Sequence, residues 1–267
     1  MCMPGCREAV GRTLSRRGFF GAAAATTAFA ATPAQAQRGF TRVIDLTHTL
    51  SPAFPTFFGV PGIEIERRYT LRRNGANVNW WRVLEHAGTH IDAPIHYAEN
   101  GAAVEAIPAD QLVVPLAVVD VSEQAVRNAD YALSRGDVTE WEARYGQLPD
   151  GCCVAMHSGW GRHANDAAKY TGKDAAGAFH FPGIHPEAAE WLLRERRVVG
   201  LGVDTLSLDP GRSKDFKTHA TWLPSGRWGI ENLANLEQVP PTGATLVAGV
   251  PKVKGATGAP ARILALV

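Results

Sequence analysis

The segment HAGTHIDAPIH, residues 86–96, constrains its local backbone more than any other stretch of this 267-residue chain. Gly88 and Pro94 argue against a helix, because glycine lowers helix stability and a proline inside a helix removes a hydrogen bond. The segment follows a strand-like run, so we expect an extended backbone. Alternate side chains of an extended chain share a face, so four polar residues would point to one side: His86, His90, Asp92 and His96.

These four side chains suit a divalent transition ion. Neutral imidazole and carboxylate are ligands of Zn²⁺ and Mn²⁺, and three protein ligands leave a position open for water. An ion with an open position can activate water for hydrolysis. A polar loop whose histidines bond to backbone carbonyls would show the same residues. The spacing favours a metal site formed by two imidazoles and a carboxylate, with a further imidazole nearby.

The first 36 residues resemble an export signal rather than part of a fold. Arg16 and Arg17 precede an apolar run and then Ala34-Gln35-Ala36, the order of a cleavable signal. The paired arginines are typical of the twin-arginine route, which exports folded proteins. The alternative is a membrane anchor, but the run is shorter than the roughly 20 residues that a spanning helix needs. We therefore expect a periplasmic protein that is not bound to a membrane once the signal is removed.

Residues 37–267 have the composition of one globular domain. Hydrophobic residues make up 45% of the whole chain and charged residues 20%, and no low-complexity linker divides this part. The net charge of +1, without a basic stripe or a phosphate-binding glycine loop, gives no reason to expect a nucleic-acid partner. Cys152 and Cys153 are adjacent, and neighbouring cysteines rarely form an unstrained disulfide, so we expect two small buried side chains.

The residue pattern predicts a mixed α/β fold. One helix is predicted from a cap at Asp137 through Arg144, ending at Gly146, and another over 186–197, beginning at Pro186. The second leads directly into a strand-like run, as in an α/β layer. Strands are predicted over residues 43–47, 79–85, 113–121, 152–156, 198–204, 245–250 and 262–267.

The segment at 86–96 resembles the H-x-G-T-H-x-D-x-P-x-H signature of the cyclase family, which includes bacterial kynurenine formamidase and isatin hydrolase. The resemblance extends along the chain in four further segments, in the family's order: VIDLTHTLSP, FPGIHPEAAEWL, GLGVDTLSLDPG and WGIENLANLEQVP. It implies a single mixed α/β domain with a central β-barrel-like core flanked by helices. It also implies a homodimer.

The same resemblance assigns roles by position. His86, His90 and Asp92 match the family's metal ligands, and His96 matches its catalytic proton carrier. His219 and Glu231, twelve residues apart, match a histidine and a glutamate that hold a second zinc in the formamidases. Isatin hydrolases use a single manganese. The resemblance therefore implies one or two divalent ions, Zn²⁺ or Mn²⁺.

The implied reaction is hydrolysis of the C–N bond of a small aromatic amide, either cyclic or formyl, as in an arylformamidase or an isatin hydrolase. The family places an aromatic substrate contact after the opening strand, often a tryptophan in formamidases. This chain has no tryptophan there, so Phe57 is the best match, with Trp80 and Trp81 as further pocket walls. That departure, together with export, weakens the case for formylkynurenine as substrate.

Other readings remain open. A lactone or another cyclic ester is an alternative substrate, and an exported metal-binding or small-molecule-binding protein without catalysis is an alternative function. Retention of His96, His219 and Glu231 together favours the enzyme. Ser158 beside His157 suggests a nucleophile pair, but G-x-S-x-G is missing and neighbours on a strand face opposite sides. Asp204 and Asp209 could orient the site or serve only as turn residues.

Overall fold

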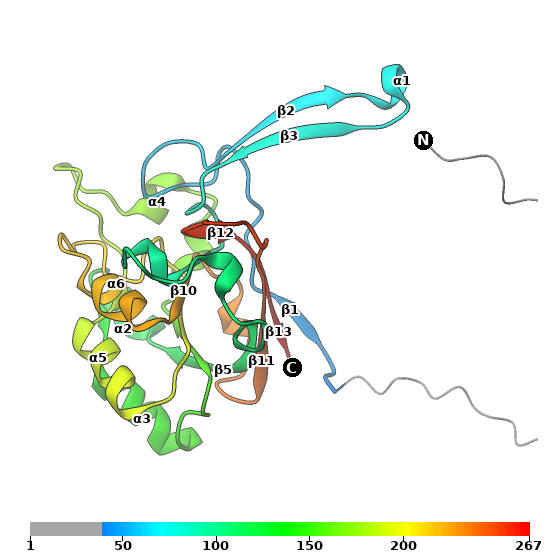
Figure 1. The fold of residues 1–267 in the computed structure, drawn as a ribbon. Coiled ribbons are helices and arrows are strands. Elements are labelled where there is room, and N and C mark those ends of the chain that lie inside the picture. The colour runs from blue at the N-terminus through cyan, green and yellow to red at the C-terminus, as the bar shows by residue number, and fades with distance from the viewer. Residues whose placement is uncertain (1–38) are drawn as a thin grey trace, which may run out of the picture. The chain divides into compact units, whose positions relative to one another are not determined.

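The computed structural model describes residues 39–267, so the export signal predicted over 1–36 lies outside the described residues. The main sheet has nine strands (Figure 1). Their spatial order is β1 (Val43–Asp45), β13 (Arg262–Leu266), β11 (Ala244–Gly249), β5 (Val113–Asp120), β7 (Cys153–His157), β9 (Gly200–Val203), β10 (Trp228–Glu231), β4 (His90–Asp92) and β12 (Gly258–Pro260).

The remaining elements are short. The helices are α1 (Leu71–Asn74), α2 (Ser122–Arg127), α3 (Arg135–Tyr145), α4 (Ala167–Thr171), α5 (Pro186–Glu195) and α6 (Lys217–Trp222). Two small sheets pair β2 (Ile63–Tyr69) with β3 (Val78–Val83), and β6 (Ala132–Leu133) with β8 (Gly183–Ile184). Single 3₁₀ turns span Pro94–His96, Val104–Ala106, Ala109–Leu112, Trp160–His163, Leu223–Ser225 and Leu236–Gln238. No helix among residues 39–267 is long and apolar enough to cross a membrane.

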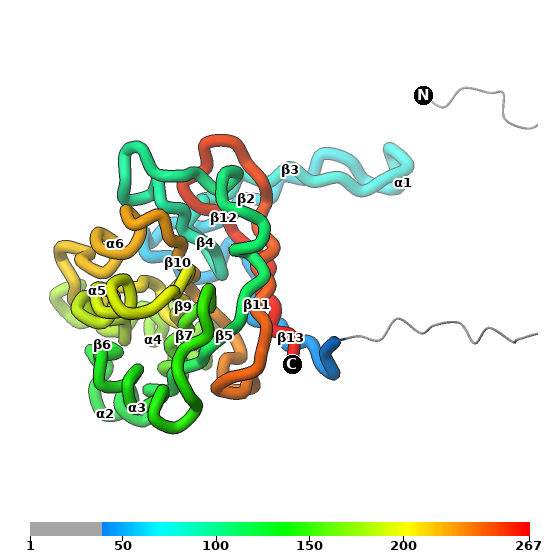
Figure 2. Tube along the Cα trace, turned by 60° about the horizontal axis from the view of Figure 1, so that its bottom comes forward, coloured from blue at the N-terminus to red at the C-terminus, as the bar shows by residue number. Residues whose placement is uncertain are grey.

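The main sheet separates two hydrophobic cores, because successive side chains of a strand point to opposite faces. On β5, Leu116 and Val118 enter one core, while Ala117 and Val119 enter the other. The first core is lined mainly by strands and lies on the inner side of the sheet, which curls into a half-barrel (Figure 2). The second core is covered by α3, α5 and α6. The predicted single mixed α/β domain with a barrel-like centre is confirmed.

Two helices begin close to their predicted positions. The α3 helix ends before Gly146 as expected, but its N-cap is Ser134, whose hydroxyl accepts the backbone N–H of Asp137. Asp137 occupies the third helical position, and its carboxylate accepts the backbone N–H of Ser134, which completes a capping box. The α5 helix starts at Pro186, as predicted, and buries Trp191 and Leu192 in the second core.

One hairpin leaves the body of the domain. Strands β2 and β3, joined by α1, extend outward in both ribbon and tube views, and we call residues 63–83 the arm (Figures 1 and 2). Only Ile63, at its base, is buried.

Candidate active site

The segment at 86–96 is extended only over β4, His90–Asp92. Gly88 adopts a positive φ of 62°, and Pro94–His96 forms a 3₁₀ turn, so the prediction of one continuous extended face is wrong outside β4. The turns nevertheless place His86 and His96 close to each other beside β4. The His86 and His96 rings stack with centroids 3.9 Å apart.

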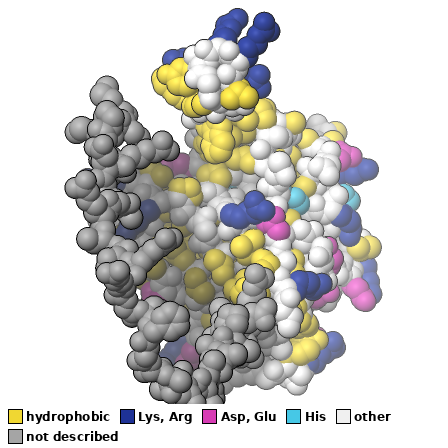
Figure 3. Space-filling model, turned by 90° about the vertical axis from the view of Figure 1, so that its right-hand side faces the viewer, with side chains coloured by type: hydrophobic (Ala, Val, Ile, Leu, Met, Phe, Trp, Pro, Cys, Tyr) yellow, Lys and Arg dark blue, Asp and Glu magenta, His cyan; other side chains and the backbone are white. Residues whose placement is uncertain are grey.

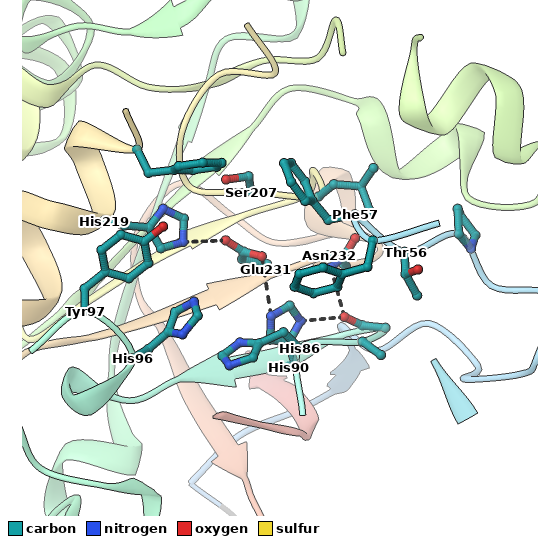
Figure 4. Close-up of a pocket in the computed structure, with 16 residues that line it drawn as sticks. Thr56, Phe57, His86, His90, His96, Tyr97, Ser207, His219, Glu231 and Asn232 are labelled. Atoms are coloured by element: carbon teal, nitrogen blue, oxygen red, sulfur yellow. Dashed lines mark hydrogen bonds and ion pairs between the residues drawn. The ribbon is translucent and has the colours of Figure 1, made fainter. Parts of the chain in front are cut away.

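Distant parts of the chain complete a cluster around β4. In the β4–β10 ladder Glu231 lies directly opposite His90, and α6 supplies His219. His90 Nε2 lies 3.3 Å from Asp92 Oδ1 and 3.4 Å from Glu231 Oε2. His219 Nε2 lies 3.0 Å from Glu231 Oε1 and 3.5 Å from Asp92 Oδ2. The structure therefore brings together all six residues that the resemblance assigned, which we call the cluster: His86, His90, Asp92, His96, His219 and Glu231. Figure 4 shows all of them except Asp92.

Hydrogen bonds fix which ring atom of each histidine faces the centre. The Nδ1 of His90 is 2.8 Å from the Gly88 carbonyl, and the Nδ1 of His219 is 2.6 Å from Asp209 Oδ2. Each Nδ1–H therefore donates outward, which leaves Nε2 free to act as a ligand. His86 points its Nδ1 toward Asp92 Oδ1 at 2.6 Å, and its Nε2 contacts Thr257 Oγ1.

The donor set fits a divalent ion. His90 Nε2 and Asp92 Oδ2 are buried and have no hydrogen-bond partner, although buried polar atoms are nearly always paired. Two groups of side chains have donor atoms within 4.8 Å of one another, and both include Asp92: His86 with His96, and His90 with Glu231. Imidazole and carboxylate donors around a shared aspartate suit one or two ions of the Zn²⁺ or Mn²⁺ type.

Burial and charge set the ionisation of the cluster. Burial alone would lower the pKa of His90, but the charges of Asp92 and Glu231 outweigh it and raise that pKa to about 9. Burial alone would raise the pKa of Asp92, but contacts with the surrounding histidines hold that pKa well below its usual range. Burial lowers the pKa of His96 to about 4, so its ring is neutral at neutral pH. His96 therefore differs from His90 and His219, whose pKa values are raised by the neighbouring carboxylates.

The cluster lies at one side of a cavity of about 270 Å³. Phe57 lines it, as predicted, and its ring stacks on Phe179 with centroids 4.7 Å apart. The lining also includes Tyr97 and Phe216, which the sequence analysis did not single out. The structure does not bring Trp80 and Trp81 to this cavity, because both lie on β3 of the arm. The lining residues are Pro55, Thr56, Phe57, Phe58, His86, Ala87, Gly88, His90, His96, Tyr97, Leu206, Ser207, Phe216, His219, Glu231 and Asn232.

Asp204 and Asp209, which the sequence left undecided, have different surroundings. Asp209 contacts His219 directly, whereas Asp204 accepts hydrogen bonds from Ser158 and from the backbone N–H of Trp160. The Ser158 hydroxyl therefore donates to a buried carboxylate, and the structure gives no support to a serine nucleophile. Asn232 is a functional neighbour that the sequence analysis missed: its side-chain amide donates to the same Gly88 carbonyl that His90 contacts.

Comparison with known proteins agrees with this geometry. The model of the putative cyclase family matches residues 44–210. The isatin hydrolase of Roseibium aggregatum is 32% identical over 246 residues, which is 86% of this chain and 93% of that protein. The kynurenine formamidase of Salinibacter ruber is 30% identical over 224 residues, covering 82% and 95% of the two chains.

Solved structures show the same fold. A crystal structure of an isatin hydrolase bound to the product analogue thioisatinate superposes with a TM-score of 0.80 at 30% identity, covering 85% of this chain and 92% of that chain. The isatin hydrolase A of Ralstonia solanacearum also superposes with a TM-score of 0.80, at 37% identity and the same coverage.

Proposed function

The chain belongs to the putative cyclase family, and from this membership we propose that it is a metal-dependent hydrolase that opens the C–N bond of a cyclic aromatic amide such as isatin. The observation that carries the proposal is the buried cluster at the side of an aromatic-lined cavity. His96 supports an enzyme rather than a binding protein, because its ring stacks on His86 and lines the same cavity, where it can carry a proton.

By the family resemblance, His86, His90 and Asp92 would hold the catalytic ion, and both histidines contact Asp92 Oδ1. His219 with Glu231 would complete that site or hold a second ion. Zn²⁺ or Mn²⁺ bound there would polarise the amide carbonyl and favour attack by water. The protein holds these ligands in place through outward hydrogen bonds, from His90 to the Gly88 carbonyl and from His219 to Asp209.

The proton is handled by His96. Its neutral ring accepts one proton from the attacking water as the new C–O bond forms. The protonated ring then donates to the amide nitrogen as the C–N bond breaks, which leaves a free amine and a carboxylic acid that loses its remaining proton to solvent.

The cavity favours an uncharged, flat substrate. Its lining contains four aromatic carbocycles, at Phe57, Phe58, Tyr97 and Phe216, but no lysine or arginine. N-Formylkynurenine carries an amino-acid carboxylate, which would enter this cavity without a lysine or arginine to pair with it. Burying such a charge unpaired is costly. A cyclic amide without a charged tail, such as isatin, avoids that cost.

The decisive experiment compares turnover of isatin and N-formylkynurenine by the purified protein, reconstituted separately with Zn²⁺ and with Mn²⁺. We expect a higher kcat/KM for isatin and no turnover after chelation. A higher kcat/KM for N-formylkynurenine would instead indicate that the protein is a formamidase. Hydrolysis of neither amide, with rapid hydrolysis of an aromatic lactone, would support the cyclic-ester alternative.

Two further parts of the proposal concern location and assembly. The paired Arg16 and Arg17 before an apolar run support export of the folded protein to the periplasm. The family resemblance supports a homodimer.

A further inference from the structure

His86 faces the centre of the cluster with a different ring nitrogen from His90 and His219. Those two histidines turn Nε2 toward the carboxylates, whereas His86 turns Nδ1, which lies 2.6 Å from Asp92 Oδ1. The His86 Nε2 points away from that carboxylate and lies 2.9 Å from Thr257 Oγ1. Whether the Thr257 hydroxyl donates or accepts therefore decides which nitrogen of His86 carries the proton.

The Thr257 hydroxyl already has a partner for its proton. Its Oγ1 donates to Glu85 Oε2 at 2.5 Å, and the backbone N–H of Thr257 donates to the same oxygen at 3.1 Å. An ionised carboxylate only accepts hydrogen bonds, and a hydroxyl has one proton to give. Thr257 Oγ1 can therefore only accept from His86, so the His86 ring carries its proton on Nε2.

That position of the proton leaves a lone pair on His86 Nδ1 that faces the Asp92 carboxylate. Two lone pairs held 2.6 Å apart repel each other, so a cation belongs between them. If the Thr257 hydroxyl were free to turn and donate to Nε2 instead, the ring proton would move to Nδ1. A proton there would block the atom through which His86 can bind a metal ion.

Backbone pairing holds Thr257 beside His86. In the β4–β12 ladder Gly258 lies opposite Asp92, and the backbone N–H of Ala93 donates to the Thr257 carbonyl at 2.9 Å. A Cβ atom on Gly258 would lie 2.5 Å from His86 Cε1, so glycine allows β12 to approach the ring this closely. The Thr257 hydroxyl therefore has a fixed place next to His86.

Glu85 lies just beyond the end of β3, where the arm joins the body of the domain (Figure 3). Glu85 and Thr257 are half-buried, and neither residue lines the cavity. Neither belongs to the segments on which the family resemblance rests. Their side chains therefore reach the cluster through His86, from the side away from the cavity.

We propose that Glu85 and Thr257 are positioning residues of the metal site. Glu85 orients the Thr257 hydroxyl, the hydroxyl keeps the proton of His86 on Nε2, and His86 therefore binds the ion through Nδ1. This inference rests on the proposed function, because it requires that the cluster binds a divalent ion. It gives His86 an outward hydrogen bond that corresponds to the one from His90 to a backbone carbonyl.

The first test measures the affinity for Zn²⁺ and for Mn²⁺ by competition with a calibrated chelator. Thr257→Val removes the hydroxyl but keeps the shape of the side chain, so we expect roughly 10–100-fold weaker binding. Thr257→Ser restores a hydroxyl and should bind close to the wild-type affinity. Circular dichroism verifies that both variants are folded. Wild-type affinity in Thr257→Val overturns the proposal, as does an equal loss in both variants, which would indicate packing rather than the hydroxyl.

A second pair of variants separates Glu85 from the general anchoring of this segment. In Glu85→Gln the new amide can donate to the Thr257 hydroxyl and turn its proton toward His86, so metal affinity should fall. Glu105→Gln is the matched control, because Glu105 Oε1 accepts the backbone N–H of Gly255 at 3.0 Å in the same segment. The control should bind metal as wild type does. Equal affinities in the two glutamine variants contradict the role of Glu85.

The nitrogen that binds the ion can be observed directly. In protein loaded with NMR-active cadmium and labelled with an NMR-active nitrogen isotope at histidine, coupling between the two nuclei identifies each ligand nitrogen. We expect one histidine coupled through Nδ1 and the others through Nε2, and Thr257→Val should weaken the Nδ1 coupling selectively. Coupling only through Nε2 overturns the proposal, because His86 would then not bind as described.

These measurements need no substrate, so the two proposals can fail separately. A wild type that binds the ion but hydrolyses neither amide contradicts the proposed function and leaves the assignment of Glu85 and Thr257 to the affinity data. Hydrolysis of isatin together with equal metal affinities of wild type and Thr257→Val contradicts only the present inference. A wild type that binds no divalent ion contradicts both.

Discussion

Asp209 Oδ2 lies 2.6 Å from His219 Nδ1, and the same carboxylate accepts the backbone N–H groups of Thr218 and His219. One buried side chain thus fixes both the start of α6 and the ring orientation of a predicted metal ligand. Burial alone would raise the pKa of Asp209, but these contacts, chiefly with His219, keep it below its usual value. The carboxylate therefore stays charged and keeps the proton of His219 on Nδ1.

Asp209→Asn tests this arrangement. An amide in place of the carboxylate weakens the bond to Nδ1–H, so we expect metal affinity to fall by roughly 10–100-fold. Competition with a calibrated chelator measures that affinity directly. Asp215→Asn, at an exposed position on the same loop, serves as the control and should bind metal as wild type does. Equal affinities in the two variants would show that Asp209 has only a structural role.

His90→Ala should abolish both bound metal and activity. Its Nε2 faces Asp92 and Glu231, and the remaining ligands rarely hold a divalent ion in an open site. Elemental analysis of the purified protein provides the measurement. His163→Ala, outside the cluster, should keep full metal content. Stoichiometric metal in His90→Ala would refute its assignment as a ligand.

His96→Ala should separate chemistry from metal binding. We expect metal content close to that of wild type and a kcat about 10²–10⁴-fold lower, the usual contribution of a positioned proton carrier. Because the lowered pKa of His96 keeps its ring neutral, activity should be present above that pKa and fall as pH drops through it. The variant should lose this acidic limb of the kcat/KM profile. If the substitution removes the ion instead, His96 is a ligand.

Glu142 and Arg196 predict how stability depends on pH. Their side chains form two 2.7 Å bonds and are mostly buried, and the bond to Arg196 lowers the pKa of Glu142. The stabilisation of the folded state by this pair is therefore present above the unfolded pKa of the Glu142 carboxyl. It is lost as pH falls through the lower pKa of that carboxyl in the folded protein. Glu142→Gln should reduce the free energy of unfolding by about 1–3 kcal/mol at pH 7. Urea titrations should show that this difference shrinks in acid, whereas Glu123→Gln, in an exposed pair, changes little.

Replacing Arg16 and Arg17 together with lysine tests export. The paired arginines identify a twin-arginine signal, so the doubly substituted precursor should stay uncleaved in the cytoplasm. Fractionation with N-terminal sequencing of the recovered protein measures this. Normal recovery of protein beginning near Gln37 from the periplasm would contradict the prediction.

The sequence by itself predicted several strands of the main sheet, the helices α3 and α5, and the part of the cluster that lies in residues 86–96, but not α1, α2, α4 or α6. The alternating or continuous apolar runs of β5, β7, β9, β11 and β13 are local properties, so their positions could be predicted without knowing what they pair with. The motif around His90 contains His86, His90, Asp92 and His96, and chemistry restricts which side chains hold an ion. His219 and Glu231 were assigned only by the resemblance to the cyclase family. Within residues 86–96 the prediction of an extended backbone was correct only for β4. The motif indicates which side chains are present but not where the backbone turns.

The tertiary structure decided which residues support the cluster and which do not. Asp204 and Asp209 occur in one short segment with similar turn chemistry, and only the approach of α6 gives Asp209 its contact with His219. Trp80 and Trp81 were predicted as pocket walls, but both lie on β3 of the arm and do not line the cavity. Both side chains are exposed, because no part of residues 39–267 outside the arm packs against them. Sequence period fixes the face on which a side chain lies, but the partner of that face is set by contacts between residues far apart in the chain.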